Sequence, residues 1–439
     1  MVELIYNILN TAWQVVLNWW WVPVPFIIFG SEKKMGSFKF MWLWWRREVW
    51  IFAQKFVLLE IKMPMEVLKP LRSMEQVFSS IWGNVYDPPD KFWEKWFEGK
   101  MLLSVQLEMI GLNGEPHLYV RCHESRRNAI EASIYSQYPE AEISLADDYT
   151  KYVPQDVPNR NWDIWGCDYE LIKPDVYPLK TYPKFFEERE ALKEEKRVDP
   201  MATLLEGFGT LGPGEQLWIQ IAASPVSIVE NNFVDRGRKE ADRLAKRPEE
   251  AKQKPILQEA FDEVAYGKVP GEEKNEELKI EALLPVEARM TPGERDIVAG
   301  VEDKISKRCF DSYIRFIYLA KRDVYFGGGK AVPLGFFQQF ATENLNQPKP
   351  WTRTITKVKR YPVLDLWRAR RLFIRKRRLF FRYVKRMSPL FPRPGGNFIL
   401  NTEELATIFH FPGHTVAPAP FVSRVEAKRG EAPPGLPVE

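Results

Sequence analysis

Cysteine and histidine are scarce in this sequence, which has three cysteines and four histidines among 439 residues. Cys122, Cys167 and Cys309 are scattered and odd in number, so we expect buried thiols in a reducing compartment rather than a disulfide framework. No cysteine has the spacing of a zinc site, since Cys122 and His123 are sequence neighbours and point apart on a strand. We therefore expect no metal site and no cofactor.

Motifs for catalysis are lacking as well. Gly327–Lys330 reads Gly-Gly-Gly-Lys, but Ala331 follows the lysine where a phosphate loop needs serine or threonine. Gly207–Gly214 closes a predicted helix instead of opening one, which is typical of a C-cap and not of a dinucleotide loop. The acidic pair Asp147–Asp148 consists of neighbours, whose side chains do not face each other. We expect no catalytic residues, and hence a protein that is not an enzyme.

Charge is absent between Leu4 and Phe29, and half of the sixteen tryptophans lie in the first fifty residues. Indole rings collect where hydrocarbon meets water, and about 20 apolar residues cross a bilayer as a helix. Residues 1–30 are therefore expected to form a helix that either spans a bilayer or lies in its interface. The tryptophans expected to anchor this segment and the one after it are Trp13, Trp19, Trp20, Trp21, Trp42, Trp44 and Trp45.

Four amides interrupt this apolar leader at steps of three and four residues, so they share one helical face. Lipid cannot satisfy them, and we expect them to face another helix, water or headgroups. They are Asn7, Asn10, Gln14 and Asn18. Residues 31–54 are aromatic and basic, as in a juxtamembrane helix. Positive charge after the leader predicts that the bulk of the chain lies on the cytoplasmic side of a membrane, with membrane lipid as a partner.

The remaining pattern alternates strands and helices. Residues 55–150 read strand, helix, strand, an Asn113–Gly114 hairpin turn, strand, helix and strand, which is the ferredoxin-like order. Residues 160–400 repeat this plan around a charged helical insertion at 235–310, within which Thr291 and Glu294 form a capping box. The fold class we predict is α+β: a membrane helix, two ferredoxin-like units with the second interrupted, a basic helix and an extended C-terminal tail.

A basic helix is expected at 366–387, where ten Arg or Lys and no acid interleave with apolar residues. Such a helix can bind nucleic-acid phosphates, anionic lipid headgroups or an acidic protein surface. It can equally be a solvated face whose long side chains cover apolar surface. The residues expected to make the contact are Arg368, Arg370, Arg371, Arg375, Lys376, Arg377, Arg378 and Arg382.

Four strings carry a family resemblance that covers nearly the whole chain. They are VLLEIKMPMEVLKPLRSMEQVFSSIWG (57–83), IEASIYSQYPEAEIS (130–144), LLEGFGTLGPGEQLWIQI (204–221) and FILNTEELATIFHFPG (398–413). The sequence thereby resembles a bacterial family of membrane-anchored modules associated with HerA/VirB-type ATPases of conjugation-like and type IV secretion systems. In that family the last string stands shortly before the ATPase core, whereas this sequence has no Walker motif. The resemblance implies a bacterial inner-membrane location, and it implies that ATP hydrolysis belongs to another chain.

The resemblance also implies a docking role for residues 401–439, which we expect to form a docking segment and a Pro/Gly-rich tail. The residues expected to dock the partner are Glu403, Glu404, Phe409, His410 and Phe411, with His410 a packed core or interface residue. The function we predict is a non-enzymatic, membrane-anchored scaffold that docks a HerA/VirB-type ATPase supplied in trans. The alternative is a membrane-associated nucleic-acid-binding protein that uses 366–387. A second copy of the chain is a further candidate partner.

Overall fold

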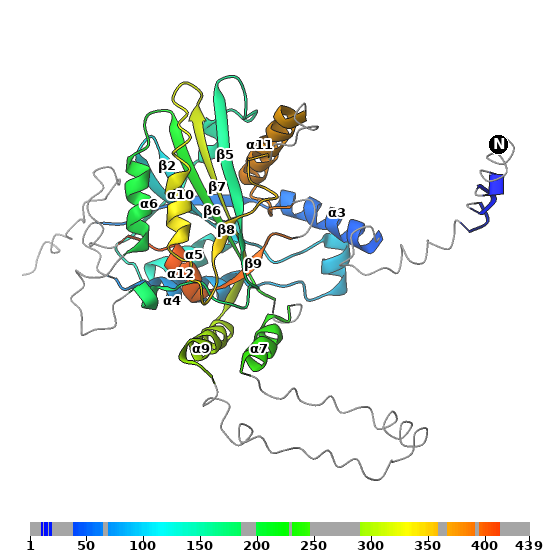
Figure 1. Ribbon diagram of the computed structural model, residues 1–439, viewed down its shortest axis with the longest axis horizontal. Coiled ribbons are helices and arrows are strands. Elements are labelled where there is room, and N and C mark those ends of the chain that lie inside the picture. Colours follow the sequence, from blue (N-terminus) through cyan, green and yellow to red (C-terminus); the bar gives the residue numbers. More distant parts are fainter. Residues whose placement is uncertain are drawn as a thin grey trace, which may run out of the picture.

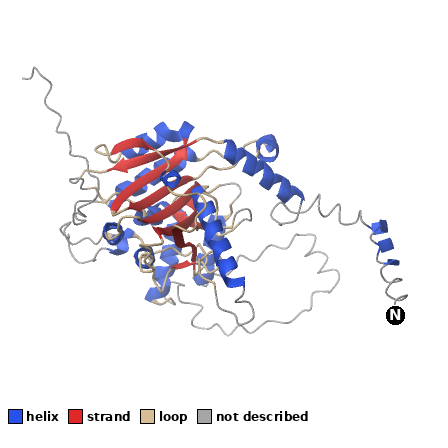
Figure 2. Ribbon diagram, turned by 90° about the horizontal axis from the view of Figure 1, so that it is seen from above, coloured by secondary structure: helices blue, strands red, loops and turns tan. Residues whose placement is uncertain are grey.

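A computed structural model gives the conformation of most of the chain. It describes residues 10–11, 13–15, 17–19, 38–64, 69–185, 199–227, 231–245, 290–358, 367–390 and 395–412. The strands are β1 (Phe56–Lys62), β2 (Val105–Leu112), β3 (Glu115–His123), β4 (Glu142–Ala146), β5 (Trp162–Leu171), β6 (Glu215–Pro225), β7 (Cys309–Lys321), β8 (Pro348–Pro350) and β9 (Phe398–Asn401). They form one nine-stranded sheet (Figure 2).

Every pair of neighbouring strands in this sheet is antiparallel, and the strand order is β4-β1-β3-β2-β6-β7-β5-β8, with β9 paired to the first residues of β7. The strands of the first half of the chain meet those of the second half at β2 and β6. This junction runs from the Val105–Ala223 pair to the Leu112–Gln216 pair. The two halves therefore share one hydrogen-bonded sheet and are not separate units.

Helices and short turns surround the sheet (Figure 1). The helices are α3 (Phe38–Ala53), α4 (Leu71–Val85), α5 (Arg127–Tyr135), α6 (Pro200–Gly209), α7 (Phe233–Leu244), α9 (Pro292–Ser306), α10 (Ala331–Gln338), α11 (Arg368–Val384) and α12 (Thr402–Ile408). The short helical segments are the π-helix η1 (Glu94–Glu98) and the 3-10 helices η2 (Glu124–Arg126), η3 (Tyr149–Tyr152) and η4 (Tyr182–Phe185). In Figure 1, α7 and α9 lie together beyond one end of the sheet.

Local sequence explains where several elements begin and turn. Asn113 and Gly114 have φ values of 51° and 97°, as the tight turn between β2 and β3 requires. The side chain of Asp199 accepts a hydrogen bond from the Met201 N–H and so caps α6. The predicted capping box of Thr291 and Glu294 is present at the start of α9.

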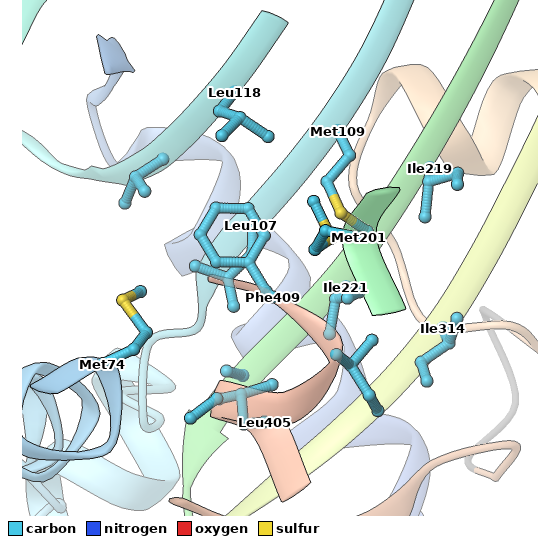
Figure 3. Packing of buried hydrophobic residues seen from close by; sticks show 14 of the residues in the cluster. Met74, Leu107, Met109, Leu118, Met201, Ile219, Ile221, Ile314, Leu405 and Phe409 are labelled. Carbon is cyan, nitrogen blue, oxygen red and sulfur yellow. The ribbon is translucent and has the colours of Figure 1, made fainter. Parts of the chain in front are cut away.

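Successive side chains of a strand point to opposite faces of the sheet. Each of the two faces is covered by a hydrophobic core. Leu107 and Ile219 belong to the larger core, which is covered by α4, α5, α6, α10 and α12 (Figure 3). Trp218 and Ile317, on the opposite face, join a second core with residues of α11. A third core lies between α7 and α9. The sheet thus has no open polar face around β2, β6 and β7.

The predicted fold class is wrong in its overall arrangement. We expected two ferredoxin-like units behind an N-terminal membrane helix, and the structure instead has a single antiparallel sheet that runs through both halves. Hydrogen bonding between β2 and β6 replaces the expected boundary between units. The predicted strand at Phe398–Leu400 exists as β9, although it pairs with β7 and does not close a unit of its own.

The expected membrane-spanning helix is also contradicted. None of the helices in the described part of the chain combines the length and the apolarity that a membrane crossing needs. The predictions of a membrane-spanning helix and of an inner-membrane location are therefore wrong. Of the leader at residues 1–30, only residues 10–11, 13–15 and 17–19 are described. The predicted juxtamembrane helix is α3, which carries Arg46, Arg47 and Glu48 and packs against η1.

Candidate docking helix

The basic helix predicted at 366–387 is α11, and only its carboxy-terminal half is buried. Leu379, Phe380 and Tyr383 are its buried side chains, and the Tyr383 ring lies 5.3 Å from that of Trp218 on β6. The half before Leu379 has no buried residue. In Figure 1, α11 lies beside the sheet and projects from it. One end of the helix is therefore fixed, and the other offers most of its circumference to a partner.

The outward face of α11, together with its N-cap residue Trp367, carries large apolar side chains. Trp367, Ile374 and Phe381 are 56%, 36% and 51% exposed and follow one another at intervals of seven residues. Seven residues are about two helical turns, so these three side chains lie on one line along the helix. We call them the exposed stripe. Exposed apolar side chains that form a line, rather than lying singly, indicate an interaction surface.

Four arginines flank this stripe. Arg370 and Arg377 lie on one side of it and Arg371 and Arg378 on the other, because successive residues are about 100° apart around the helix axis. All four side chains are exposed, and the Arg370 guanidinium lies 5.7 Å from the Trp367 ring centre. We call these four residues the flanking arginines.

Two of the other predicted contact residues of this helix, Arg375 and Lys376, bind to the rest of the protein. Arg375 donates hydrogen bonds to the carbonyl oxygens of Ile355 and Lys357. The Lys376 ammonium lies 2.6 Å from the Asp163 carboxylate. Arg368 and Arg382 are half-buried. The eight predicted residues therefore fall into two groups. The flanking arginines are exposed, whereas Arg368, Arg375, Lys376 and Arg382 are partly buried against the rest of the protein.

A row of buried polar side chains lies beneath the fixed end of α11. Glu108 of β2 is opposite Gln220 of β6, Gln220 is opposite Arg315 of β7, and Arg315 is opposite Asp168 of β5. All four are fully buried. Gln220 Nε2 donates to Glu108 Oε1 at 3.0 Å, and Arg315 Nε donates to Asp168 Oδ1 at 2.5 Å. Charges in such a position are costly unless they are paired.

Arg386, just after α11, completes the pairing. Its guanidinium donates to both carboxylate oxygens of Glu108, at 3.0 and 3.2 Å, and to both of Asp148, at 2.6 and 3.0 Å. Arg386 reaches them from a left-handed backbone conformation with φ 52°. Arg315 Nη2 also donates to the Met387 carbonyl at 3.0 Å. The end of α11 is thus held by hydrogen bonds from the middle of the sheet.

The electrostatics of this cluster favour its charged form. Burial alone would raise the pKa of Glu108, but the charge and hydrogen bonds of Arg386 outweigh burial and lower it. Asp148 behaves in the same way, with Arg386 and Thr150 lowering its pKa against burial. Tyr149 donates to Glu108 Oε2 at 2.8 Å, and its oxygen lies 2.8 Å from that of Tyr383. The lowered pKa values keep both carboxylates ionised at neutral pH.

The docking segment implied by the resemblance is part of the fold. Glu403, Glu404, Phe409, His410 and Phe411 are all buried. Glu404 pairs with the equally buried Lys304 at 3.0 Å and forms a capping box with Asn401. His410 Nε2 lies 2.8 Å from Asp199. These side chains hold α12 against the protein's own core, so in this conformation they present no surface to a partner.

The described members of the expected anchor fall in two segments of the chain, residues 13–19 and α3. Trp42, Trp44 and Trp45 lie on α3, where Trp42 Nε1 donates to the Trp96 carbonyl at 2.7 Å. Trp13 and Trp19 are exposed. Of the amides, Asn10, Gln14 and Asn18 are exposed. Trp20, Trp21 and Asn7 lie outside the described residues.

A cavity of about 120 Å³ beside α3 includes His123 and Ser125 in its lining. His123 Nδ1 lies 2.7 Å from Ser125 Oγ and accepts the Ser125 backbone N–H at 3.3 Å. Burial and the neighbouring Arg126 lower the pKa of His123, which favours the neutral, accepting ring. This arrangement is a cap at the start of η2, because the ring nitrogen satisfies the N–H of Ser125, the second residue of that segment.

Metal-binding and reactive groups are scarce in the part of the chain that the structure describes. In it, no group of three or more His, Cys, Asp or Glu side chains is placed to hold a metal ion. The three cysteines are free and buried, as expected. Burial raises the pKa of Cys122 and of Cys309 to about 12, so both thiols stay protonated at neutral pH.

Comparison with known proteins gives no family assignment. No protein-family model matches the sequence, and no curated protein is significantly similar to it.

Proposed function

We propose that this chain is a non-enzymatic adaptor that docks a partner protein through the outward face of α11. The observation that carries the proposal is the contrast between the two halves of the helix. Buried charges and apolar packing fix its carboxy-terminal half, while Trp367, Ile374 and the flanking arginines remain exposed. A helix that only covered the sheet would need neither a line of large apolar side chains nor four exposed arginines on its outer face.

The partner we propose is an ATPase of the HerA/VirB type, supplied in trans, in a conjugation-like or type IV secretion system. Support comes from the sequence strings at 57–83, 130–144, 204–221 and 398–413, which resemble modules of such systems. The docking surface differs from the one we expected, since the last of these strings folds into β9 and α12. The adaptor would hold the motor through α11 instead.

Co-purification tests this proposal. The full chain would be co-expressed with a HerA-type ATPase from the same organism and captured through a tag on the adaptor. We expect the ATPase to be retained by the wild type and lost with Arg377→Glu/Arg378→Glu. The matched control is Arg238→Glu/Lys239→Glu, a pair of adjacent exposed cations on α7. Failure of the wild type to retain the ATPase, or equal retention by both variants, would overturn the proposal.

Nucleic acid is a second candidate partner, because four exposed guanidinium groups on one helix face suit phosphates. Binding of this kind weakens steeply with salt, and each lost phosphate contact reduces the salt slope by about one. Fluorescence anisotropy with labelled DNA over a range of salt concentrations separates the two candidates. Absence of salt-dependent binding, or a slope unchanged in Arg377→Ala/Arg378→Ala, removes nucleic acid from consideration.

A further inference from the structure

The order of side chains on α11 carries information about the chemistry of its partner. The exposed stripe runs along the centre of the outward face, and the flanking arginines lie on both sides of it. From Trp367 to Phe381 the stripe is about 21 Å long, given the rise of a helix. An apolar centre with like charges on both borders is the pattern of one helix that packs lengthwise against another.

A second copy of this helix does not suit the surface. In a symmetric dimer the same patch faces itself, so the flanking arginines of one copy would lie close to those of the other. Like charges so placed across an interface are destabilising. Within the described part of α11 there is no acidic side chain that could compensate. The occupant must therefore bring negative charge.

A nucleic-acid strand suits the arginines and the two aromatic side chains at the ends of the stripe, but not Ile374 at its centre. The centre of the outward face is the position of closest approach, and Ile374 occupies it. An aliphatic side chain cannot stack on a base as an aromatic ring does. Placed against phosphates, it removes water from them and offers no hydrogen bond in its place. An acidic amphipathic helix satisfies both features, because its apolar side chains cover the stripe and its carboxylates meet the arginines.

We infer that α11 docks an amphipathic helix of the partner, with a large apolar residue at every seventh position and acidic residues on both sides of that line. This inference rests on the proposed function, since it specifies the part of the ATPase that the adaptor holds. The buried pairing of Arg386 with Glu108 and Asp148 fixes the direction in which α11 projects. The surface is therefore already ordered before the partner arrives, which lowers the entropic cost of docking.

The test uses designed peptides and the full chain. The probe is a 21-residue helical peptide with the repeat Leu-x-x-Glu-Glu-x-x, where x is alanine or glutamine. One comparison peptide has the same composition with its leucines spread around the helix, and another has lysine in place of glutamate. A single-stranded DNA of 20 nucleotides is the fourth ligand. Affinity is measured by fluorescence anisotropy at one fixed salt concentration.

We expect the Glu repeat to bind at least about tenfold more tightly than the scrambled peptide, and the Lys repeat not to bind. Ile374→Asn should weaken the Glu repeat about tenfold. The control Ile172→Asn, at another exposed isoleucine, should leave it unchanged. Equal affinity for the ordered and scrambled acidic peptides would overturn the inference, as would DNA binding at least as tight as that of the Glu repeat.

The outcome is separable from that of the co-purification experiment. If the ATPase is retained but Ile374→Asn changes neither its retention nor peptide binding, the adaptor function stands and the helix-pairing inference fails. If the peptide binds as expected and the ATPase is not retained, the surface is assigned correctly and the proposed partner is wrong. A thermal melt of each variant shows whether the fold is intact, and these exposed positions should leave it so.

Discussion

The guanidinium of Arg386 donates two hydrogen bonds to the carboxylate of Glu108, although the two residues are 278 positions apart in the chain. Glu108 lies in β2 at the junction of the two halves of the sheet, and Arg386 follows the last turn of the docking helix. The pair therefore links the position of α11 to the packing of the sheet. Replacing either residue should destabilise both the sheet and the attachment of α11.

Replacement of Arg386 by methionine tests this connection. We expect Arg386→Met to lower the free energy of unfolding by about 3–5 kcal/mol, because it leaves Glu108 buried without its counter-charge. Adding Glu108→Gln should restore part of the loss by removing that charge. Urea denaturation measures both. The control Arg378→Met, on the exposed face, should change the free energy by no more than about 0.5 kcal/mol. A double variant no more stable than the single one would contradict the account.

The same cluster should make stability depend on acidity. Burial opposes the ionisation of Glu108 and Asp148, but Arg386 outweighs it, so their pKa values are lower in the folded protein than in the unfolded chain. The stabilisation is present above the unfolded values of about 4.3 and 3.9, and it is lost as the pH falls through the folded values. Denaturation between pH 5 and pH 2 should show a weaker acid dependence in Arg386→Met/Glu108→Gln than in the wild type.

Asp311 should act in the opposite sense. Burial raises its pKa to about 6, and its carboxylate accepts a hydrogen bond from Asn397 at 3.1 Å. A raised pKa means that the folded protein binds the proton more tightly than the unfolded chain does. Asp311 therefore lowers the free energy of unfolding as the pH rises from about 4 to 6. Asp311→Asn should remove that cost. The check is the free energy of unfolding at pH 4.5 and 7.5, and an identical pH difference in both proteins would refute the assignment.

The sequence allows most of the elements to be predicted, but not how the two halves join. Alternation predicts that Leu107 and Met109 share a face of β2, and that Glu108 takes the other. Periodicity within one strand says nothing about what covers that other face. Here the cover is α11, which is distant in sequence, and Glu108 therefore lies in a buried row of polar and charged side chains. The pairing of β2 with β6 also joins residues far apart in sequence, so it cannot be predicted from the pattern within either strand.

The docking segment separates what the residues indicate from what the resemblance implies. The Asn401–Glu404 capping box and the apolar run around Phe409 are readable as a helix packed in a core. Both features are present in α12, and both side chains of the box are buried. The expectation of a docking surface there came from the family resemblance, not from the residues. By contrast, the flanking arginines could be found from sequence, because no acid interrupts the basic helix.

Two glycines provide a matched test of how α3 is held. Gly99, just after η1, has φ 78°, and a Cβ at this position would lie 2.4 Å from the Arg46 carbonyl carbon of α3. Gly99→Ala should therefore separate α3 from η1 and lower the free energy of unfolding by about 1–3 kcal/mol. Gly335, within α10, has open space around it, and Gly335→Ala should raise that free energy by roughly 0.5–1 kcal/mol. Urea denaturation followed by tryptophan fluorescence measures both changes, since α3 carries four indole rings. If the two variants shift stability in the same direction, the close approach of the two backbones is not what fixes α3.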